Sequence, residues 1–346
     1  MFRLFILWFS FLSIGFSADV YLGAMGFDLP TLQAVHHFCR KSYRTSDDFE
    51  GITAAVKNMT ALNFEETLES ISSDGEVVAQ TWKVYPFLDK QIESTHHAGI
   101  VCINKLDKKV IVSYHGTRPS TFSRFAGDLA ITLGNLEMVD FYDHQGYEHP
   151  SLGRVFSGKI HKGYSEVIKT AIPSFERQLS SALRDTGVAL EELEFIFTGH
   201  SMGGGLASLA SASFSTRFLE GKEPRPGQIK ALVVNPACFG DKDFYESLYD
   251  VIGNMNIVSF QQQDDAVIGG LHSITRLVGH PYQTEIGLLI PIPAGTMGAG
   301  PFGHSVVEFD QILDFYTATK TILQTMGYDQ RPNDAGKIAY RNRNLK

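Results

Sequence analysis

The 346-residue sequence has few cysteines, no excess of positive charge and no internal repeat, and each shortage excludes a class of protein. With 3 Cys and no C-x-x-C pair, a disulfide-dense fold and a zinc or thioredoxin-like site are not expected. The 30 Lys and Arg against 38 Asp and Glu give a net charge of −8, so we expect no nucleic-acid partner. No linker or low-complexity run divides the chain, which favours one domain.

The cysteines and paired histidines suggest no metal site. Cys39, Cys102 and Cys238 allow either one disulfide plus a free thiol or three buried thiols. The adjacent histidines at 36–37 and 96–97 have no partner at the spacing of metal ligands on a helix. We therefore expect no metal in this protein.

The first 18 residues have the pattern of a cleaved export signal. Arg3 supplies a positive charge, and the apolar run from Leu4 to Phe16 is shorter than the roughly 20 residues that span a bilayer. The small residues Gly15, Ser17 and Ala18 then offer a cleavage site. The alternative is an uncleaved anchor. We expect residues 1–18 to be removed and 19–346 to form one domain that is secreted or otherwise exported.

Short apolar runs alternate with helical patterns through most of the chain. Residues 31–72 are expected to be helical, and the runs at 99–103 and 110–114 predict a hairpin. Further helices are expected at 164–184, 203–218 and 305–326, and further strands at 193–198, 229–235 and 255–260. Strands that alternate with helices predict an α/β fold with a mostly parallel central sheet flanked by helices.

The stretch 118–160 is long and weakly periodic, which is typical of a functional loop or lid. Five of the 25 Phe belong to the export signal, and four others fall in this stretch: Phe122, Phe125, Phe141 and Phe156. An apolar lid face suits acyl chains, so these rings favour a lipid substrate.

The pentapeptide 199–203, Gly-His-Ser-Met-Gly, fits the G-x-S-x-G motif of a nucleophile elbow. It follows an apolar strand directly and opens a helix rich in small residues, as that turn requires. Gly199 and Gly203 would relieve the crowding of a tight strand-to-helix turn, and the helix dipole would favour an anion near Ser201. The alternative is a glycine-rich turn with a structural serine. We predict that Ser201 is a nucleophile.

A serine nucleophile needs an acid and a base, which in such folds follow it in the order Asp, His. Asp264 and Asp265 follow the strand predicted at 255–260, at the strand end where catalytic groups sit. His304 lies in a Gly-Pro-Phe-Gly-His turn, and a loop can bring its imidazole over Ser201. The other downstream candidates are the acids Asp241 and Asp243, and the histidines His272 and His280, which we expect to be surface residues.

An oxyanion hole needs two convergent donors. The N–H of Met202 supplies one by its position after the nucleophile. The second is expected from the turn at 115–117, through the N–H of Thr117 and its hydroxyl. A plain turn after a strand is the alternative.

Several segments in order resemble the class 3 lipases, the fungal triacylglycerol lipase type with the α/β-hydrolase fold. They are Tyr114-His115-Gly116-Thr117, His161-Lys162-Gly163-Tyr164, the pentapeptide 199–203, Asp265-Ala266-Val267 and His304. The similarity covers about residues 98–310. His115 stands where the family has Arg, and Ala266 stands where it has Pro. The register of the Asp265-Ala266-Val267 motif favours Asp265 over Asp264.

The resemblance implies ester hydrolysis through an acyl-enzyme, without a metal or organic cofactor, with a lid within 118–160. Ser201, Asp265 and His304 would form the triad, and Thr117 and Met202 the oxyanion hole. We therefore expect an exported serine esterase or lipase that acts on lipid or other acyl esters at a transient membrane or micelle surface. One alternative is a phospholipase A or lipid acyltransferase with the same triad. Another is a secreted effector that binds a host or membrane partner on a hydrolase scaffold.

Overall fold

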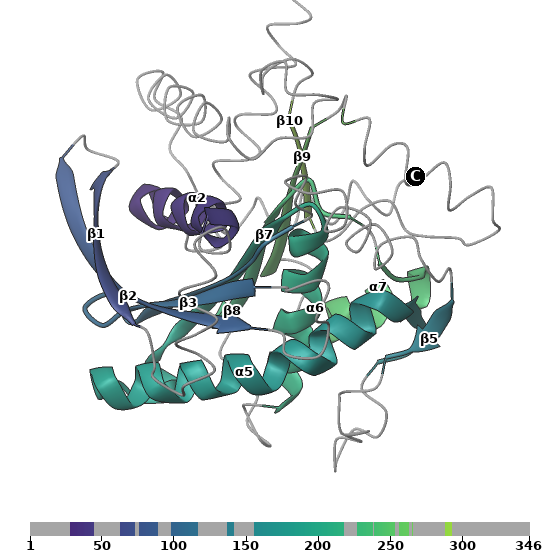
Figure 1. The fold of residues 1–346 in the computed structure, drawn as a ribbon. Helices are drawn as coiled ribbons and strands as arrows, with labels where there is room; N and C mark the ends of the chain where they lie inside the picture. Colours follow the sequence, from purple (N-terminus) through teal and green to yellow (C-terminus); the bar gives the residue numbers. More distant parts are fainter. Residues whose placement is uncertain are drawn as a thin grey trace, which may run out of the picture.

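A computed structural model describes residues 28–44, 63–72, 76–88, 98–116, 137–141, 156–217, 227–237, 239–252, 256–262, 265 and 288–292 (Figure 1). The helices are α2 (Leu29–Arg44), α5 (Lys162–Thr186), the 3-10 turn η1 (Leu190–Glu192), α6 (Met202–Arg217) and α7 (Lys242–Ile252). The strands are β1 (Phe64–Ile71), β2 (Val77–Leu88), β3 (Ala98–Asn104), β4 (Lys109–Tyr114), β5 (Met138–Asp140), β6 (Lys159–His161), β7 (Glu194–His200), β8 (Ile229–Val234), β9 (Ile257–Gln262) and β10 (Leu288–Ile292). None of the helices in these ranges is long and apolar enough to cross a membrane.

Eight strands form one mixed sheet in the order β1-β2-β3-β4-β7-β8-β9-β10. The pairs from β1 to β4 are antiparallel, and those from β4 to β10 are parallel. In the parallel part Tyr114 pairs with Gly199, and His200 with Val234. The carboxyl ends of β4, β7 and β8 therefore meet at one edge, which is where ligands bind in such sheets.

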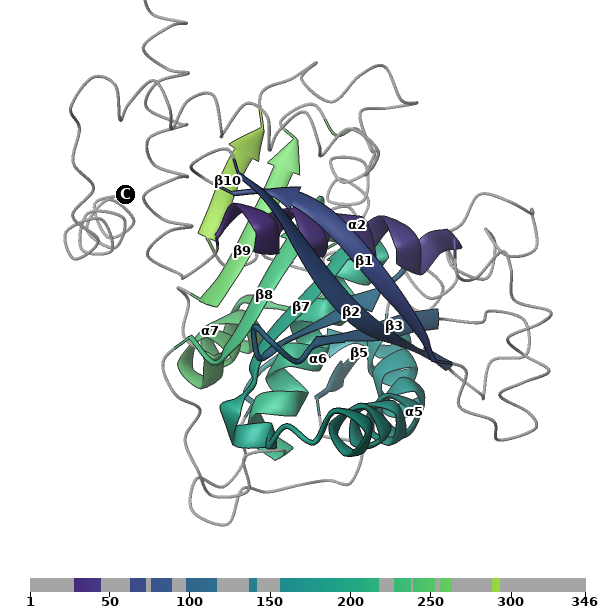
Figure 2. The same cartoon turned by 90° about the vertical axis from the view of Figure 1, so that its left-hand side faces the viewer.

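Helices cover both faces of the sheet, as the alternation in β7 requires. Phe195 and Phe197 point into a cluster with Phe214 of α6, whereas Thr198 faces α2, where its hydroxyl contacts the thiol of Cys39. Figure 2 shows α2 on one side of the sheet and α5, α6 and α7 on the other. The architecture is that of the α/β-hydrolases.

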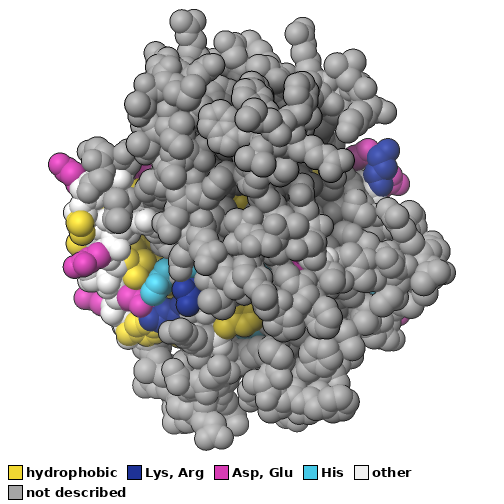
Figure 3. Space-filling model, turned by 90° about the horizontal axis from the view of Figure 1, so that it is seen from above, with side chains coloured by type: hydrophobic (Ala, Val, Ile, Leu, Met, Phe, Trp, Pro, Cys, Tyr) yellow, Lys and Arg dark blue, Asp and Glu magenta, His cyan; other side chains and the backbone are white. Residues whose placement is uncertain are grey.

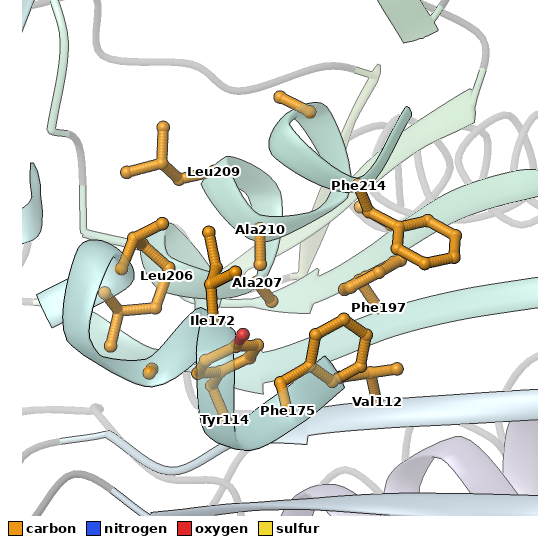
Figure 4. Close-up of a cluster of buried hydrophobic side chains, with 14 of the residues drawn as sticks. Val112, Tyr114, Ile172, Phe175, Phe197, Leu206, Ala207, Leu209, Ala210 and Phe214 are labelled. Carbon is orange, nitrogen blue, oxygen red and sulfur yellow. The ribbon is translucent and has the colours of Figure 1, made fainter. Parts of the chain in front are cut away.

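The main core lies between the sheet and α5 and α6. Figure 4 shows aromatic rings from three elements in contact: Phe175 of α5, Phe197 of β7 and Phe214 of α6. Burying one such ring stabilises the fold by about 2–3 kcal/mol relative to leaving it in water. This packing fixes α6, and hence the turn that precedes it, against the sheet. The other labelled members of the cluster are Val112, Tyr114, Ile172, Leu206, Ala207, Leu209 and Ala210.

Charged side chains attach α2 to the antiparallel end of the sheet. Glu66 of β1 accepts hydrogen bonds from His37 at 3.0 Å and Lys41 at 2.6 Å. At the other end of the helix, Lys109 of β4 pairs with Asp28 at 2.9 Å. Figure 3 shows histidine, basic and acidic side chains next to one another on one face of the molecule. The position of α2 over β4 and β7 is thereby set from both ends.

Most predicted elements are present, but one prediction was wrong. The hairpin 99–103 and 110–114 is confirmed as β3 and β4, and α5, α6, β7, β8 and β9 lie where the pattern indicated. Residues 31–72 are not one helical region, because α2 ends at Arg44 and Phe64–Ile71 forms β1. All eight residues of β1 pair with β2, and this cross-strand pairing outweighs the helical propensity of Glu and Leu. The expected export signal at 1–18 and helix at 305–326 lie outside the described residues.

Two of the four phenylalanines assigned to a lid belong to the core. Phe141 and Phe156 are buried, with ring centroids 5.3 Å apart, and both contact Phe244 of α7. The short strands β5 and β6 pair antiparallel beside them. These two rings therefore cannot form an acyl-facing lid surface. Phe122 and Phe125 lie outside the described residues.

Candidate active site

Ser201 occupies the tight turn between β7 and α6, with a φ of 57°. A positive φ is uncommon for a residue other than glycine and costs about 1–3 kcal/mol, so the surrounding structure has to impose it. The Ser201 N–H donates to the carbonyl of Val234 at 3.0 Å, and its carbonyl accepts from the N–H groups of Ala237 at 3.1 Å and Gly204 at 3.0 Å. The end of β8 and the first turn of α6 thus hold the serine in this conformation.

The two glycines of the motif are required by contact between main chains. A Cβ on Gly199 would lie 2.8 Å from the carbonyl oxygen of Tyr114, and one on Gly203 would lie 2.7 Å from the carbonyl carbon of His115. Distances under 3.0 Å are essentially absent from real Cβ contacts. Ser201 therefore lies in the strand–turn–helix geometry that the motif predicts, with the end of β4 packed against it.

Met202 is the first residue of α6 and is buried. The N-terminal end of a helix favours negative charge, because the peptide dipoles align there. The N–H of Met202 thus lies at the end of α6 that favours negative charge. Ser201 itself is 7% exposed.

The loop after β8 supports the serine, and sequence analysis missed it. Asn235 has a φ of 42°, and its N–H donates to the carbonyl of Phe260 at 2.7 Å. Asparagine tolerates this left-handed conformation better than most residues. Ala237, two residues further on, binds the Ser201 carbonyl. The Asn235-Pro236 dipeptide is a turn signal that could have pointed to this loop.

The turn after β4 packs directly against the elbow. His115 and Gly116 are both buried, and His115 Nδ1 lies 2.7 Å from the carbonyl oxygen of Gly116. A Cβ on Gly116 would collide with the carbonyl oxygen of His200 and with the hydroxyl of Tyr43. Thr117, the predicted second oxyanion donor, follows immediately and lies outside the described residues.

Tyr43, near the end of α2, also reaches the elbow. Its hydroxyl lies 2.9 Å from His200 Nδ1 and donates to the His200 carbonyl at 3.3 Å. The Tyr43 and His115 rings are 6.2 Å apart. Because 157 residues separate Tyr43 from His200, no local sequence pattern could have indicated this contact.

Asp265 lies just beyond β9, two places from β7 in the sheet, and is buried at 6% exposure. The competing acid Asp241 has another role: its carboxylate accepts from the N–H groups of Phe244 and Lys159, both at 2.9 Å, and caps the start of α7. Asp243 is exposed on that helix. The structure thus brings Ser201 and Asp265 to one edge of the sheet. Asp264, His272, His280 and His304 lie outside the described residues.

The two described cysteines are free and buried. Burial raises the pKa of the Cys39 thiol to about 12, and it also raises that of Cys102 well above its usual range. Cys238 lies outside the described residues. Within the described ranges no group of three or more His, Cys, Asp or Glu side chains could hold a metal ion.

Comparison with known proteins finds one family that this chain resembles over part of its length. The family model described as lipase (class 3) matches residues 111–268. Similar solved structures include the lipase of Rhizopus microsporus var. chinensis, at 16% identity and a TM-score of 0.40, with 59% of this chain and 55% of that chain covered. Lipase II from Rhizopus niveus has 18% identity and a TM-score of 0.40, with 57% of this chain and 64% of that chain covered. M37 lipase has 14% identity and a TM-score of 0.44, with 83% of this chain and 86% of that chain covered.

The chain spans less than two thirds of the length of the two Rhizopus lipases. No curated protein sequence matches it. The sheet order, the strained serine between β7 and α6, and the family match agree with one another. The resemblance to the class 3 lipases is therefore confirmed, with an α/β-hydrolase fold and with residues 111–268 as the segment that carries the family pattern.

Proposed function

We propose that this protein is a serine hydrolase of lipid acyl esters, with Ser201 as nucleophile, His304 as base and Asp265 as the acid that orients His304. The main support is the conformation of Ser201, whose φ of 57° is held by main-chain hydrogen bonds from both sides. Strain of this kind in a nucleophile elbow lifts the serine hydroxyl towards the edge where substrate binds. The family match supports the same chemistry.

In the first half-reaction Ser201 Oγ attacks the ester carbonyl carbon and its proton passes to His304. The carbonyl oxygen becomes an oxyanion, stabilised by the N–H groups of Met202 and Thr117. When the bond to the alcohol oxygen breaks, His304 returns the proton to that oxygen, and the acyl group remains on Ser201. Asp265 keeps the imidazole in the required tautomer and stabilises its positive charge.

In the second half-reaction an acceptor hydroxyl attacks the acyl-enzyme. If the acceptor is water, His304 takes its proton and then returns it to Ser201 Oγ, and a free carboxylic acid leaves. If the acceptor is a lipid alcohol, the same steps give acyl transfer. The triad alone does not distinguish these acceptors, so lipid substrates have to be assayed both in water and with an added alcohol. Export through residues 1–18 and a lid formed by other parts of 118–160 belong to the same proposal.

Substitution of the serine tests the proposal directly. Ser201→Ala should abolish hydrolysis of short-chain nitrophenyl esters and labelling by a fluorophosphonate probe, since both need the Ser201 oxygen. Ser215→Ala is a matched control, because Ser215 is buried on the same helix and its hydroxyl only donates to the Ser211 carbonyl at 2.8 Å. Retained activity in Ser201→Ala would refute the assignment.

The outcome with lipid substrates identifies the acyl ester. If the rate of triacylglycerol hydrolysis rises sharply once the substrate concentration is high enough to form micelles, the protein is a lipase that acts at a surface. Release of fatty acid from phospholipid would instead indicate a phospholipase. Ser201-dependent transfer of the acyl group to an added alcohol would indicate an acyltransferase. A wild-type protein that neither labels nor hydrolyses any ester would favour a binding role for the scaffold.

A further inference from the structure

Helix α2 lies outside the segment that matches the family. Two of its side chains nevertheless contact successive residues on one face of β7. Cys39 contacts Thr198, and Tyr43 contacts His200. Four residues of helix rise about 6 Å, and two residues of strand rise about 6.6 Å, so the spacings match. The helix therefore runs along β7 towards the elbow, and Tyr43 lies beside the residue that precedes Ser201.

The Tyr43 hydroxyl lies between the two segments expected to supply the oxyanion donors. On one side it is 2.9 Å from His200 Nδ1 and 3.3 Å from the His200 carbonyl. On the other side it occupies the space that a side chain on Gly116 would need. One hydroxyl thus touches both the residue before Ser201 and the residue before Thr117.

We infer that Tyr43 is a positioning residue, which sets the separation between the turn after β4 and the elbow after β7. Oxyanion stabilisation needs donors about 2.7–3.1 Å from the developing charge, and a shift of about 1 Å can cost about 10²-fold in rate. A hydroxyl placed between the two segments fixes the spacing between Gly116 and His200, and each of these residues precedes a proposed oxyanion donor. The inference rests on the proposed hydrolase function, because it concerns the same site.

Tyr43→Phe removes the hydroxyl and keeps the ring. We expect kcat to fall about tenfold with KM unchanged, because the donors would shift by less than 1 Å and substrate binding does not use them. Labelling of Ser201 by the fluorophosphonate probe should slow by a similar factor. Values of kcat are taken per probe-reactive Ser201, so an unfolded fraction does not lower them.

Tyr85→Phe is the matched control, since it removes another partly buried tyrosine hydroxyl, one that donates to Asp185 Oδ2 at 3.0 Å. Tyr85 packs on the α5 side of the sheet, opposite α2. This variant should lower the melting temperature as Tyr43→Phe does, but leave kcat unchanged. A merely structural role for Tyr43 predicts no difference in kcat between the two variants.

A second comparison tests the path through His200. The effects of Tyr43→Phe and His200→Gln on kcat should be less than additive, because the two side chains share one contact. The inference would be overturned by additive effects, by a wild-type kcat in Tyr43→Phe, or by an equal loss of kcat in Tyr85→Phe. In each of these cases the proposed function still stands if the wild type shows Ser201-dependent hydrolysis. A wild type without Ser201-dependent hydrolysis would overturn both.

Discussion

A side chain on Gly203 would collide with Tyr114, since its Cβ would lie under 3.0 Å from the Tyr114 carbonyl oxygen. Tyr114 ends β4 and Gly203 lies in the first turn of α6, so the contact joins the end of β4 to the helix that follows Ser201. Close approach of main chains, rather than a side-chain bond, therefore sets the geometry of this edge. Any added volume has to push the two segments apart.

Gly203→Ala should reduce kcat by at least about 10²-fold, because an overpacked contact shifts main chain that carries the catalytic groups. The free energy of unfolding should fall by about 1–3 kcal/mol. Nitrophenyl ester kinetics and urea denaturation measure the two effects. Gly187→Ala is the control: Gly187 has a φ of 67° at the end of α5 with nothing within 4 Å, so alanine there costs stability but not kcat. Wild-type kcat in Gly203→Ala would contradict the prediction.

Phe156→Ala should lower the free energy of unfolding by about 3–5 kcal/mol, because it removes a buried ring that packs on Phe141 and Phe244. Equilibrium unfolding in urea measures this. The dependence of activity on micelles should stay as in the wild type. If stability were unchanged and only the response to micelles were lost, Phe156 would be a lid residue after all.

The buried thiols should be inert in the folded protein. In a Cys238→Ser background neither Cys39 nor Cys102 should react with a disulfide reagent at pH 8, since the thiolate is the reactive form and burial raises the pKa of both. Both should react once guanidinium unfolds the chain. Thiol titration before and after unfolding makes the comparison. Rapid reaction in the native state would mean that α2 opens away from the sheet.

Asp28 should make stability depend on pH at the acid end. Its carboxylate, 56% exposed, caps α2 by accepting from the Thr31 N–H at 2.7 Å. Burial raises the pKa of Asp28, but hydrogen bonds from Thr31 and Lys109 outweigh it, and the net pKa lies below 3.8. The charged form therefore stabilises the fold above pH 3.8, and that stability is lost as pH falls through the lower folded pKa.

The substitution Asp28→Asn keeps a capping oxygen and removes the charge. The wild type should exceed it in stability by less than about 1 kcal/mol at pH 7, because water screens the partly exposed pair with Lys109. The difference should shrink as the pH falls below 3.8 and through the lower folded pKa. Thermal melts of both proteins at several pH values test this, and a pH-independent difference would contradict it.

The local pattern of the chain was enough to predict the elbow. A strand before Gly199, small residues at both flanks and a helix after Ser201 are all local features, and the strain on the serine follows from them. The same holds for β8 and β9, whose apolar runs are buried on both faces of a parallel sheet. At Phe64–Ile71 the helical propensity of the residues gave a wrong prediction of a helix, because pairing with β2 is a non-local interaction.

By itself the sequence predicted the elbow around Ser201, the strands at 229–235 and 255–260 and the resemblance to the class 3 lipases, because each rests on patterns local in the chain. Only the tertiary structure decided which distant groups meet at the elbow. It placed Tyr43 against His200, the Asn235–Ala237 loop on the Ser201 carbonyl, and Phe141 and Phe156 in the core. The physical reason is that such contacts depend on how helices dock on a twisted sheet, and close packing sets that docking over the whole domain.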